Sequence, residues 1–296
     1  LNIPWHFIET NKNNASKLFL SKKKHDYWKY ADGLCSYPVM NEFDALNSMK
    51  DKKIIHNDAL IINGQSGDFI SGGHIPLSLM EGKSDTEILI KYIIKKNYFI
   101  WENFNNNKNY EKIIKKILST LDLKKDSYLN LAELIGKYEQ WEWQERQAKW
   151  VVNGQRVYEF FDFDWELPFW KPEIIHFWKA VPLNLRLNQF LYKEYLSNFN
   201  YKGLFKNFES ESRRWPKHLN NLMKLSQTSN KFFGIPSKNF EKYMSFWGHY
   251  SNQYAFFGLK FFMKNIRKAT VPPQGRGTIA LGILHWLKEN NLEFKE

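Results

Sequence analysis

The stretch ALIINGQSGDFISGGHIP, residues 59–76, joins a short apolar run to a glycine-rich loop. The apolar residues 59–62 predict a buried strand. One carboxylate, Asp68, lies among the glycines that follow, which are Gly64, Gly67, Gly72 and Gly73. In open α/β sheets ligands bind beyond the carboxyl ends of the strands, and glycines let backbone N–H groups approach an anion. The stretch therefore indicates an α/β fold with a phosphate site at a strand end.

The spacing within the loop leaves two interpretations open. Neither the Walker A pattern nor the GxGxxG pattern is present, so a glycine turn without a ligand fits as well as a phosphate site. If phosphate does bind, the carboxylate of Asp68 would repel it unless a cation lies between them. The phosphate interpretation therefore includes Mg²⁺ beside Asp68.

Segments before the loop alternate between strand and helix patterns. Mixed apolar residues predict a short strand over residues 3–8, and helical composition predicts helices over 14–31 and 41–52. With the strand at 59–62, the order is strand, helices, strand and loop. That order is typical of an α/β fold.

Segments after the loop have helical spacing. We expect helices over residues 86–99, over 110–121, from Asp126 or Ser127 to about Val152, from Pro172 to Pro182, and over 188–199. The last 100 residues are rich in aromatic side chains and are expected to form helical core. The sequence thus predicts an α/β class with a partial parallel sheet, followed by a largely α-helical C-terminal half.

Composition limits the function classes. A chain of 296 residues with 43% hydrophobic content can bury a large core. No window approaches the roughly 18 apolar residues of a membrane helix, and the first ten residues lack signal-peptide features, so we expect no membrane insertion and a cytoplasmic location. The single cysteine, Cys35, can form neither an internal disulfide nor a metal site.

The net charge of +12 raises the question of nucleic-acid binding. The lysines are spread along the chain beside many asparagines, and SKKK at residues 21–24 is the one tight basic run. This distribution is typical of a solvated surface. Nucleic acid is therefore not expected as a partner.

Two stretches resemble the asparagine synthase-like ATP pyrophosphatases. Residues 63–74, NGQSGDFISGGH, resemble that family's S-G-E-G-G-D-E-x-F-G-G-Y loop. The segment from EQWEWQERQAKW to LNQFLYKEYL resembles its D-R-x-S-M, R-x-P-F-L-D and K-x-L-L-R-E motifs in order and separation. The match covers residues 55–76 and 138–196. It implies a sheet of the adenine nucleotide alpha hydrolase-like type, with a nucleotide-binding part over 1–80 and a mainly helical part over 81–296.

The resemblance implies a synthetase that uses Mg²⁺ and ATP. Such an enzyme adenylates a carboxylate, releases pyrophosphate and lets ammonia attack the acyl-adenylate to form an amide. It implies nucleotide-binding roles for Asn63, Gly64, Ser66, Gly67 and Asp68, with Asp68 also holding the metal.

Departures from the family pattern concern the charged positions. The family's loop glutamate is Gln65, its second acidic position is Phe69, and the lysine expected at pyrophosphate is Gln189. Arg186 and Lys193, one helical turn to either side, are the candidate replacements for that lysine. These changes favour a carboxylate substrate other than aspartate, and a sugar acid is the class that atypical members suggest. A degenerate binding or scaffold protein is the alternative.

Two further features of the family are not in the sequence. The first nucleotide loop, S-G-G-x-D-S, has no counterpart, because SGG occurs only at residues 71–73 and His74 follows it. Residues 1–10 resemble the family's second strand, so we expect such a loop within about 40 residues before Leu1. The glutaminase domain is also missing, which implies a separate glutaminase or another ammonia source. His74 occupies the place of a family tyrosine, where contact with the ligand is one interpretation and a structural role is the favoured one.

Overall fold

The described part of the chain is mostly helical. The computed structural model describes residues 3–9, 12–32, 35–38, 40, 42–80, 85–98, 100–101, 106–205, 225, 258–265, 268 and 276–292. Within these ranges the sheet has two strands and the other regular elements are helices. The α/β class holds in this coarse sense, with far more helix than strand.

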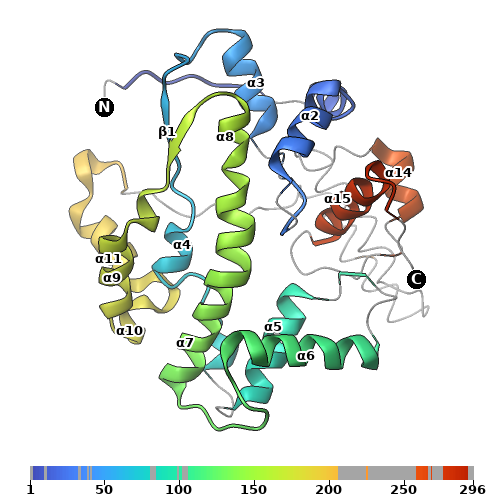
Figure 1. Cartoon of the computed structure of the whole chain (residues 1–296). Coiled ribbons are helices and arrows are strands. Elements are labelled where there is room, and N and C mark those ends of the chain that lie inside the picture. Colours follow the sequence, from blue (N-terminus) through green and yellow to red (C-terminus); the bar gives the residue numbers. More distant parts are fainter. Residues whose placement is uncertain are drawn as a thin grey trace.

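The two strands are parallel, and this arrangement creates the site. Strand β1, Leu60–Ile62, pairs with β2, Asp164–Glu166, in the register Leu60↔Asp164. One more hydrogen bond, from the Asn63 N–H to the Glu166 carbonyl at 3.0 Å, extends the ladder past β1. Parallel strands have their carboxyl ends at the same edge. The glycine loop after β1 and the segment after β2 therefore begin side by side (Figure 1).

The strand predicted over residues 3–8 does not form. Residues 3–9 have no regular structure, and Trp5 is 80% exposed. A strand is stabilised by its ladder of hydrogen bonds, and no strand within the described ranges pairs with this segment. Apolar composition without a neighbouring strand was not enough, so that prediction was wrong.

The helices before β1 pack against residues 157–163, which lie immediately before β2 in the chain. They are α1, Lys12–Phe19, α2, Lys22–Ala31, and α3, Phe43–Asp51. The single helix predicted over 14–31 is interrupted because the Ser21 hydroxyl accepts from the Lys24 N–H and caps α2. Their shared core consists of Phe19, Tyr27, Trp28, Ala31, Met40, Phe43, Leu46, Val157, Tyr158, Phe161 and Phe163.

A second core lies between three helices that follow the glycine loop. They are α5, Thr86–Asn97, α6, Asn107–Leu121, and α7, Leu131–Trp141. Their buried side chains include Leu89, Ile93, Ile117, Leu121, Leu134 and Tyr138. The cap predicted at Asp126 or Ser127 was wrong. Asn130 caps α7 instead, because it and Glu133 exchange hydrogen bonds of 3.0 and 2.9 Å in a capping box.

Helix α7 continues into an unusually wide helical segment. Residues Glu142–Val152 form the π-helix η3, and α8, Arg156–Phe160, follows it. Figure 1 shows the three as one long column beside β1 and α4. The predicted end near Val152 agrees with the end of η3. π-Helical segments are rare in proteins, and those that occur are often found at functional sites.

Short helices follow both strands. After β1 come α4, Gly67–Ile70, and η1, Leu77–Leu79. After β2 come η4, Pro168–Trp170; α9, Pro172–Ala180; α10, Leu183–Arg186; η5, Leu187–Gln189; α11, Phe190–Phe199; and η6, Tyr201–Gly203. The helix predicted between Pro172 and Pro182 is confirmed, with Pro172 in its first turn.

The C-terminal part is described in two helices. They are α14, Gly258–Asn265, and α15, Arg276–Glu289. The rest of the aromatic-rich stretch predicted as helical core, with its His249, lies outside the described residues. The domain boundary expected at residue 80 stays a prediction.

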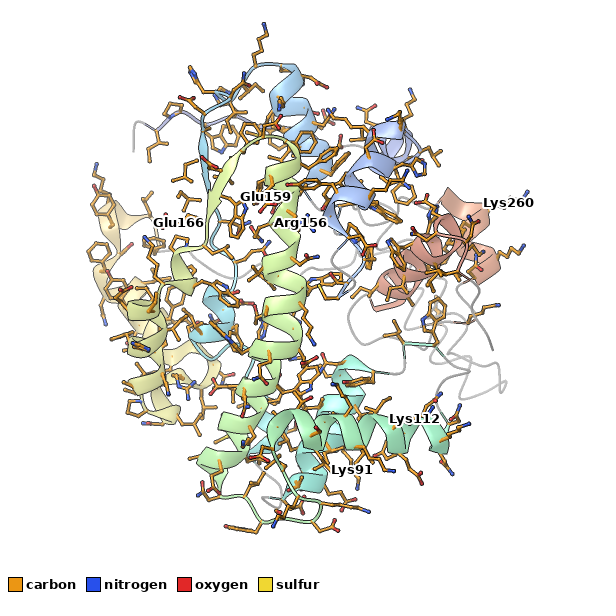
Figure 2. The ribbon with its side chains drawn as sticks, viewed as in Figure 1. Lys91, Lys112, Arg156, Glu159, Glu166 and Lys260 are labelled. Carbon is orange, nitrogen blue, oxygen red and sulfur yellow. The ribbon has the colours of Figure 1, made fainter. Side chains whose placement is uncertain are left out.

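Basic side chains project from several separate helices. Figure 2 shows Lys91 of α5, Lys112 of α6 and Lys260 of α14 pointing outward at different places. Within the ranges described above, no helix has the length and apolar content needed to cross a membrane.

Candidate functional site

The glycine loop is closely packed against the chain that follows β2. A Cβ atom on Gly67 would lie 2.8 Å from the Phe169 ring, and one on Gly72 would overlap the carbonyl oxygen of Arg186. A Cβ on Gly73 would lie 3.0 Å from the Gln189 side chain. Gly72 also has a φ of +94°, which glycine adopts without strain. At these three positions the space that a side chain would need is occupied by other atoms of the protein.

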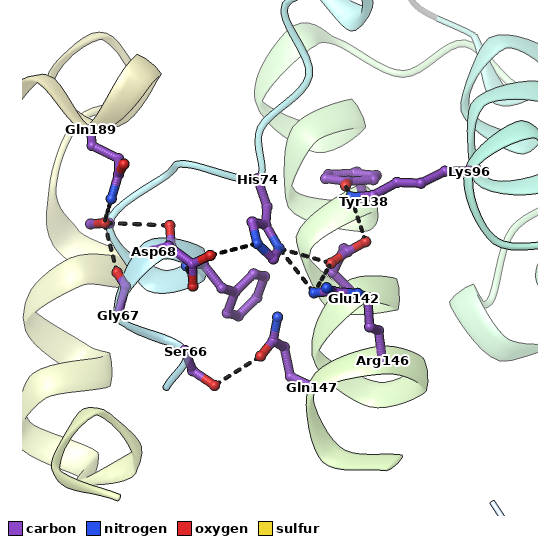
Figure 3. Close-up of polar contacts among 12 residues, drawn as sticks. Ser66, Gly67, Asp68, His74, Lys96, Tyr138, Glu142, Arg146, Gln147 and Gln189 are labelled. Carbon is purple, nitrogen blue, oxygen red and sulfur yellow. Dashed lines mark hydrogen bonds and ion pairs between the residues drawn. The ribbon is translucent and has the colours of Figure 1, made fainter. Parts of the chain in front are cut away.

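A chain of charged side chains runs from the loop into the interior (Figure 3). His74 Nε2 lies 3.0 Å from Asp68 Oδ2, and His74 Nδ1 lies 3.0 Å from Glu142 Oε2. The other oxygen of Asp68, Oδ1, accepts the N–H of Phe69 at 2.8 Å. Both carboxylates are acceptors, so an imidazolium, with a proton on each nitrogen, satisfies both contacts. The chain therefore alternates anion, cation and anion.

Glu142 is the buried end of this chain. Its side chain is 0% exposed, and it pairs with Lys96 at 2.8 Å and with Arg146 at 3.5 Å. Burial alone would raise the pKa of Glu142, but His74, Lys96 and Arg146 outweigh burial and lower it to about 2. Lys96 also donates to the hydroxyl of Tyr138. Glu142 is therefore an anion held by three cationic groups.

The partners of His74 outweigh its burial and favour its protonated form. Burial would lower the pKa of His74, whereas the bonds to Asp68 and Glu142 raise it above its ordinary value. Arg146 Nη1 lies 3.4 Å from His74 Nδ1. Since both are donors in the imidazolium state, this contact is not a hydrogen bond, and Arg146 acts on Glu142 instead.

Asp68 is the exposed end of the chain. Its side chain is 63% exposed. The hydrogen bond from His74 is the main cause that lowers the pKa of Asp68, and it outweighs partial burial. The carboxylate is therefore ionised at neutral pH and faces solvent at the carboxyl end of β1.

The donor set at Asp68 fits one kind of metal site and excludes another. Among the residues that the structure describes, no group of three His, Cys, Asp or Glu side chains could hold a metal ion. Mg²⁺ commonly binds through one or two carboxylates together with substrate phosphates and water. A single exposed, ionised carboxylate fits that mode, whereas a site made of protein ligands alone does not fit here.

A second polar chain holds the start of the loop. Asn63 donates to the Tyr158 hydroxyl at 2.6 Å, and that hydroxyl donates to Glu42. The Asn63 side-chain oxygen accepts the N–H of Gln65 at 2.9 Å. Gln155 donates to the Gln65 side-chain oxygen at 3.2 Å. The amide of Gln65 is thus oriented at a recess open to solvent, which Glu42, Trp150 and Gln155 also line.

Ser66 is enclosed between the loop and two other elements. It has a φ of 69° and is buried. Its hydroxyl donates to Gln147 at 2.8 Å and accepts from the Trp170 indole at 3.1 Å. Ser66 is expected from the resemblance to bind nucleotide, but in this structure its hydroxyl is used to join η3 and η4 to the loop. Gly64 is less tightly packed, because a Cβ there would make only an ordinary contact with the Phe169 ring at 3.9 Å.

The three candidate pyrophosphate residues occupy different surroundings. Gln189 lies at the loop, where it donates to the Ser71 hydroxyl at 2.8 Å. Arg186 is nearby, but its guanidinium pairs with Glu139 and donates to the Val181 carbonyl at 3.2 Å. Lys193 is exposed on α11. The structure brings Gln189 and Arg186 to the loop, with Arg186 already paired.

Glu142 and Lys96 were not among the site residues predicted from the sequence. Glu142 lies one helical turn beyond Tyr138, on the side of α7 where Tyr138 is buried. The spacing Tyr138, Glu142, Arg146 at i, i+4 and i+8 was the available signal, because an acid and a base four residues apart indicate a pair. The partner Lys96 comes from α5 and had no local signal.

Comparisons with protein-family models, with curated proteins and with solved structures find no match. The case for a function therefore depends on the geometry around Asp68 and on the two sequence stretches that resemble a known family.

Proposed function

We propose that this chain is the synthetase part of an ATP-dependent, amide-forming enzyme of the asparagine synthase-like kind. The reaction would be adenylation of a carboxylate with release of pyrophosphate, followed by attack of ammonia on the acyl-adenylate. A cytoplasmic location, as predicted from the sequence, suits an enzyme that uses ATP.

One observation carries the proposal. The two stretches that resemble the family, residues 55–76 and 138–196, are far apart in sequence and meet at the glycine loop. Gly72 contacts Arg186, Ser66 bonds to Gln147, and His74 bonds to Glu142. Shared motifs that belong to one active site are expected to meet in this way.

The residues of the loop then have distinct tasks. Asp68 would hold Mg²⁺, which supplies charge stabilisation to the phosphate oxygens when it is bound. Asn63 accepts the backbone N–H of Gln65, and Gln155 orients the Gln65 side-chain amide at the edge of the neighbouring recess. Since Arg186 is paired with Glu139, its guanidinium would need to leave that partner to neutralise pyrophosphate.

The substrate is proposed to be a small carboxylate other than aspartate, with a sugar acid as the leading class. The nitrogen would come from ammonia made by a separate glutaminase or another source.

Exchange of labelled pyrophosphate into ATP tests the adenylation step directly. The natural protein would be incubated with Mg-ATP, labelled pyrophosphate and a panel of sugar acids, with aspartate included. We expect exchange that depends on one sugar acid and is lost in Asp68→Ala. Exchange with aspartate alone would refute the alternative substrate class, and absence of exchange with every acid would refute adenylation.

A binding or scaffold function is the second candidate, and the packing of the loop favours it. Three glycines of the loop admit protein atoms, and Arg186 is occupied by Glu139. A protein of this kind would bind Mg-ATP or a carboxylate without turnover. Calorimetry that finds tight Mg-ATP binding, together with no pyrophosphate exchange, would favour it over the synthetase. Steeply salt-dependent RNA binding without nucleotide affinity would refute both.

A further inference from the structure

The carboxylate of Asp68 is held at both oxygens although its side chain faces solvent. Oδ1 accepts the N–H of Phe69 at 2.8 Å, and Oδ2 lies 3.0 Å from Nε2 of His74. An exposed aspartate is otherwise free to rotate about its side-chain bonds. Each oxygen can accept more than one bond, so these two contacts fix the orientation and leave capacity for a ligand.

His74 is itself fixed from the opposite side. Its Nδ1 lies 3.0 Å from Glu142, and its ring meets the Phe69 ring edge-on with centroids 5.8 Å apart. Rotation of the imidazole would break both of its contacts with carboxylates. The ring therefore acts as a rigid spacer between Asp68 and Glu142 (Figure 3).

Glu142 is fixed by elements of the second core. Lys96 of α5 and Arg146 of η3 pair with it, and it begins the π-helix at the end of α7. These contacts join the exposed loop to two packed helices. The helices are thus linked to Asp68 by three successive contacts, from Lys96 to Glu142, from Glu142 to His74 and from His74 to Asp68.

We propose that His74 is a positioning residue that holds the Asp68 carboxylate in its ligand-binding orientation, with Glu142 holding His74. The metal-binding part of this inference rests on the proposed function, in which Asp68 holds Mg²⁺. Hydrogen-bond partners of this kind commonly change metal affinity by about 10–100-fold when they are lost.

Two amide substitutions separate the two contacts of His74. In His74→Gln the amide nitrogen falls near the position of Nε2 and can still donate to Asp68. In His74→Asn the shorter side chain falls near Nδ1, so it reaches toward Glu142 and loses Asp68. The two variants have the same functional group, and His176→Gln on the exposed surface of α9 is the control.

The first measurement is Mn²⁺ binding to the full chain by calorimetry. We expect His74→Asn to weaken binding about tenfold. His74→Gln keeps the bond to Asp68 but loses Glu142, so it should weaken binding less, and His176→Gln should stay close to wild type. Equal affinity in the Gln and Asn variants would overturn the proposal. Thermal unfolding of each variant shows that a folded protein is being compared.

The second measurement needs no metal. Hydrogen exchange of the Phe69 amide reports the Asp68 carboxylate, because that amide donates to Oδ1. Exchange should be faster in His74→Asn than in His74→Gln, because only the Gln variant keeps a donor to Asp68, and the same rate in both would overturn the positioning role. If wild type binds no Mn²⁺ but the Phe69 amide responds as expected, the metal role of Asp68 fails while the positioning role stands.

Discussion

Glu142 is the least exposed of the charged groups around Asp68, so its replacement should lower the free energy of unfolding measurably. Glu142→Gln would leave Lys96, Arg146 and His74 facing a neutral amide. Loss of one partner from a buried ion pair commonly costs about 3–5 kcal/mol. We expect the free energy of unfolding in urea to fall by about 3 kcal/mol.

Glu145→Gln is the matched control for that substitution. Glu145 lies in the same π-helix and pairs with Lys149 four residues later, but both side chains reach solvent. Its loss should cost less than about 1 kcal/mol. Equal losses for the two substitutions would contradict the role given to Glu142.

The charged chain also predicts how stability depends on pH. The pKa of Glu142 is lowered from 4.5 to about 2, so its contribution is present above pH 4.5 and is lost as the pH falls toward 2. The pKa of His74 is raised from 6.5, so its contribution is present below pH 6.5 and is lost as the pH rises through the folded value.

From these two groups we expect greatest stability between about pH 5 and 6.5. Urea unfolding at a series of pH values measures this. Glu142→Gln should flatten the acid side of the curve, because Glu142 no longer titrates. An acid side as steep as that of wild type would show that other carboxylates cause the loss.

At the scale of elements, helix boundaries were predicted correctly where the sequence contains a residue that begins or ends the helix. Pro172 and Pro182 bound α9 because proline suits a first turn and ends a helix. The predicted helix boundaries were wrong where a better capping residue lay nearby. Ser21 divides the helix predicted over 14–31, and Asn130 caps α7 in place of Asp126 or Ser127.

The capping box of α7 gives a prediction for a single element. Asn130→Ala removes the acceptor for the Glu133 N–H and should lower the free energy of unfolding by about 1 kcal/mol. Ser127→Ala is the control, because Ser127 contributes its backbone carbonyl to Thr86 and that group remains. A larger loss in Ser127→Ala would restore the cap predicted from the sequence.

Residues 186–189 pass close to the glycine loop, and this close approach gives a second prediction for the elements. A methyl group at Gly72 would overlap the Arg186 carbonyl, whereas one at Gly203 would meet nothing within 4 Å. Both glycines have a positive φ. Gly203→Ala should therefore cost about 1 kcal/mol from backbone strain alone.

Gly72→Ala should cost more, because the steric overlap adds to the same strain. Denaturant unfolding of both variants isolates that excess. Equal costs would show that residues 186–189 do not approach the loop as closely as described.

At the scale of the whole molecule, the site depends on contacts that no local pattern contains. β2 is only Asp164–Glu166, and its acidic sequence gives no strand signal, yet its parallel pairing with β1 places Phe169 and Trp170 at the loop. The sequence indicated the loop, Asp68 and the later helices. It could not indicate which side chains meet there, because Lys96, Glu142 and Gln189 come from separate elements.

The most direct test of the proposed synthetase is pyrophosphate release by the natural protein, measured with Mg-ATP, ammonia and a sugar acid in wild type and in Asp68→Ala. We predict release that requires the acid, is matched by amide formation, and is abolished by the substitution. Release that persists unchanged in Asp68→Ala would contradict it.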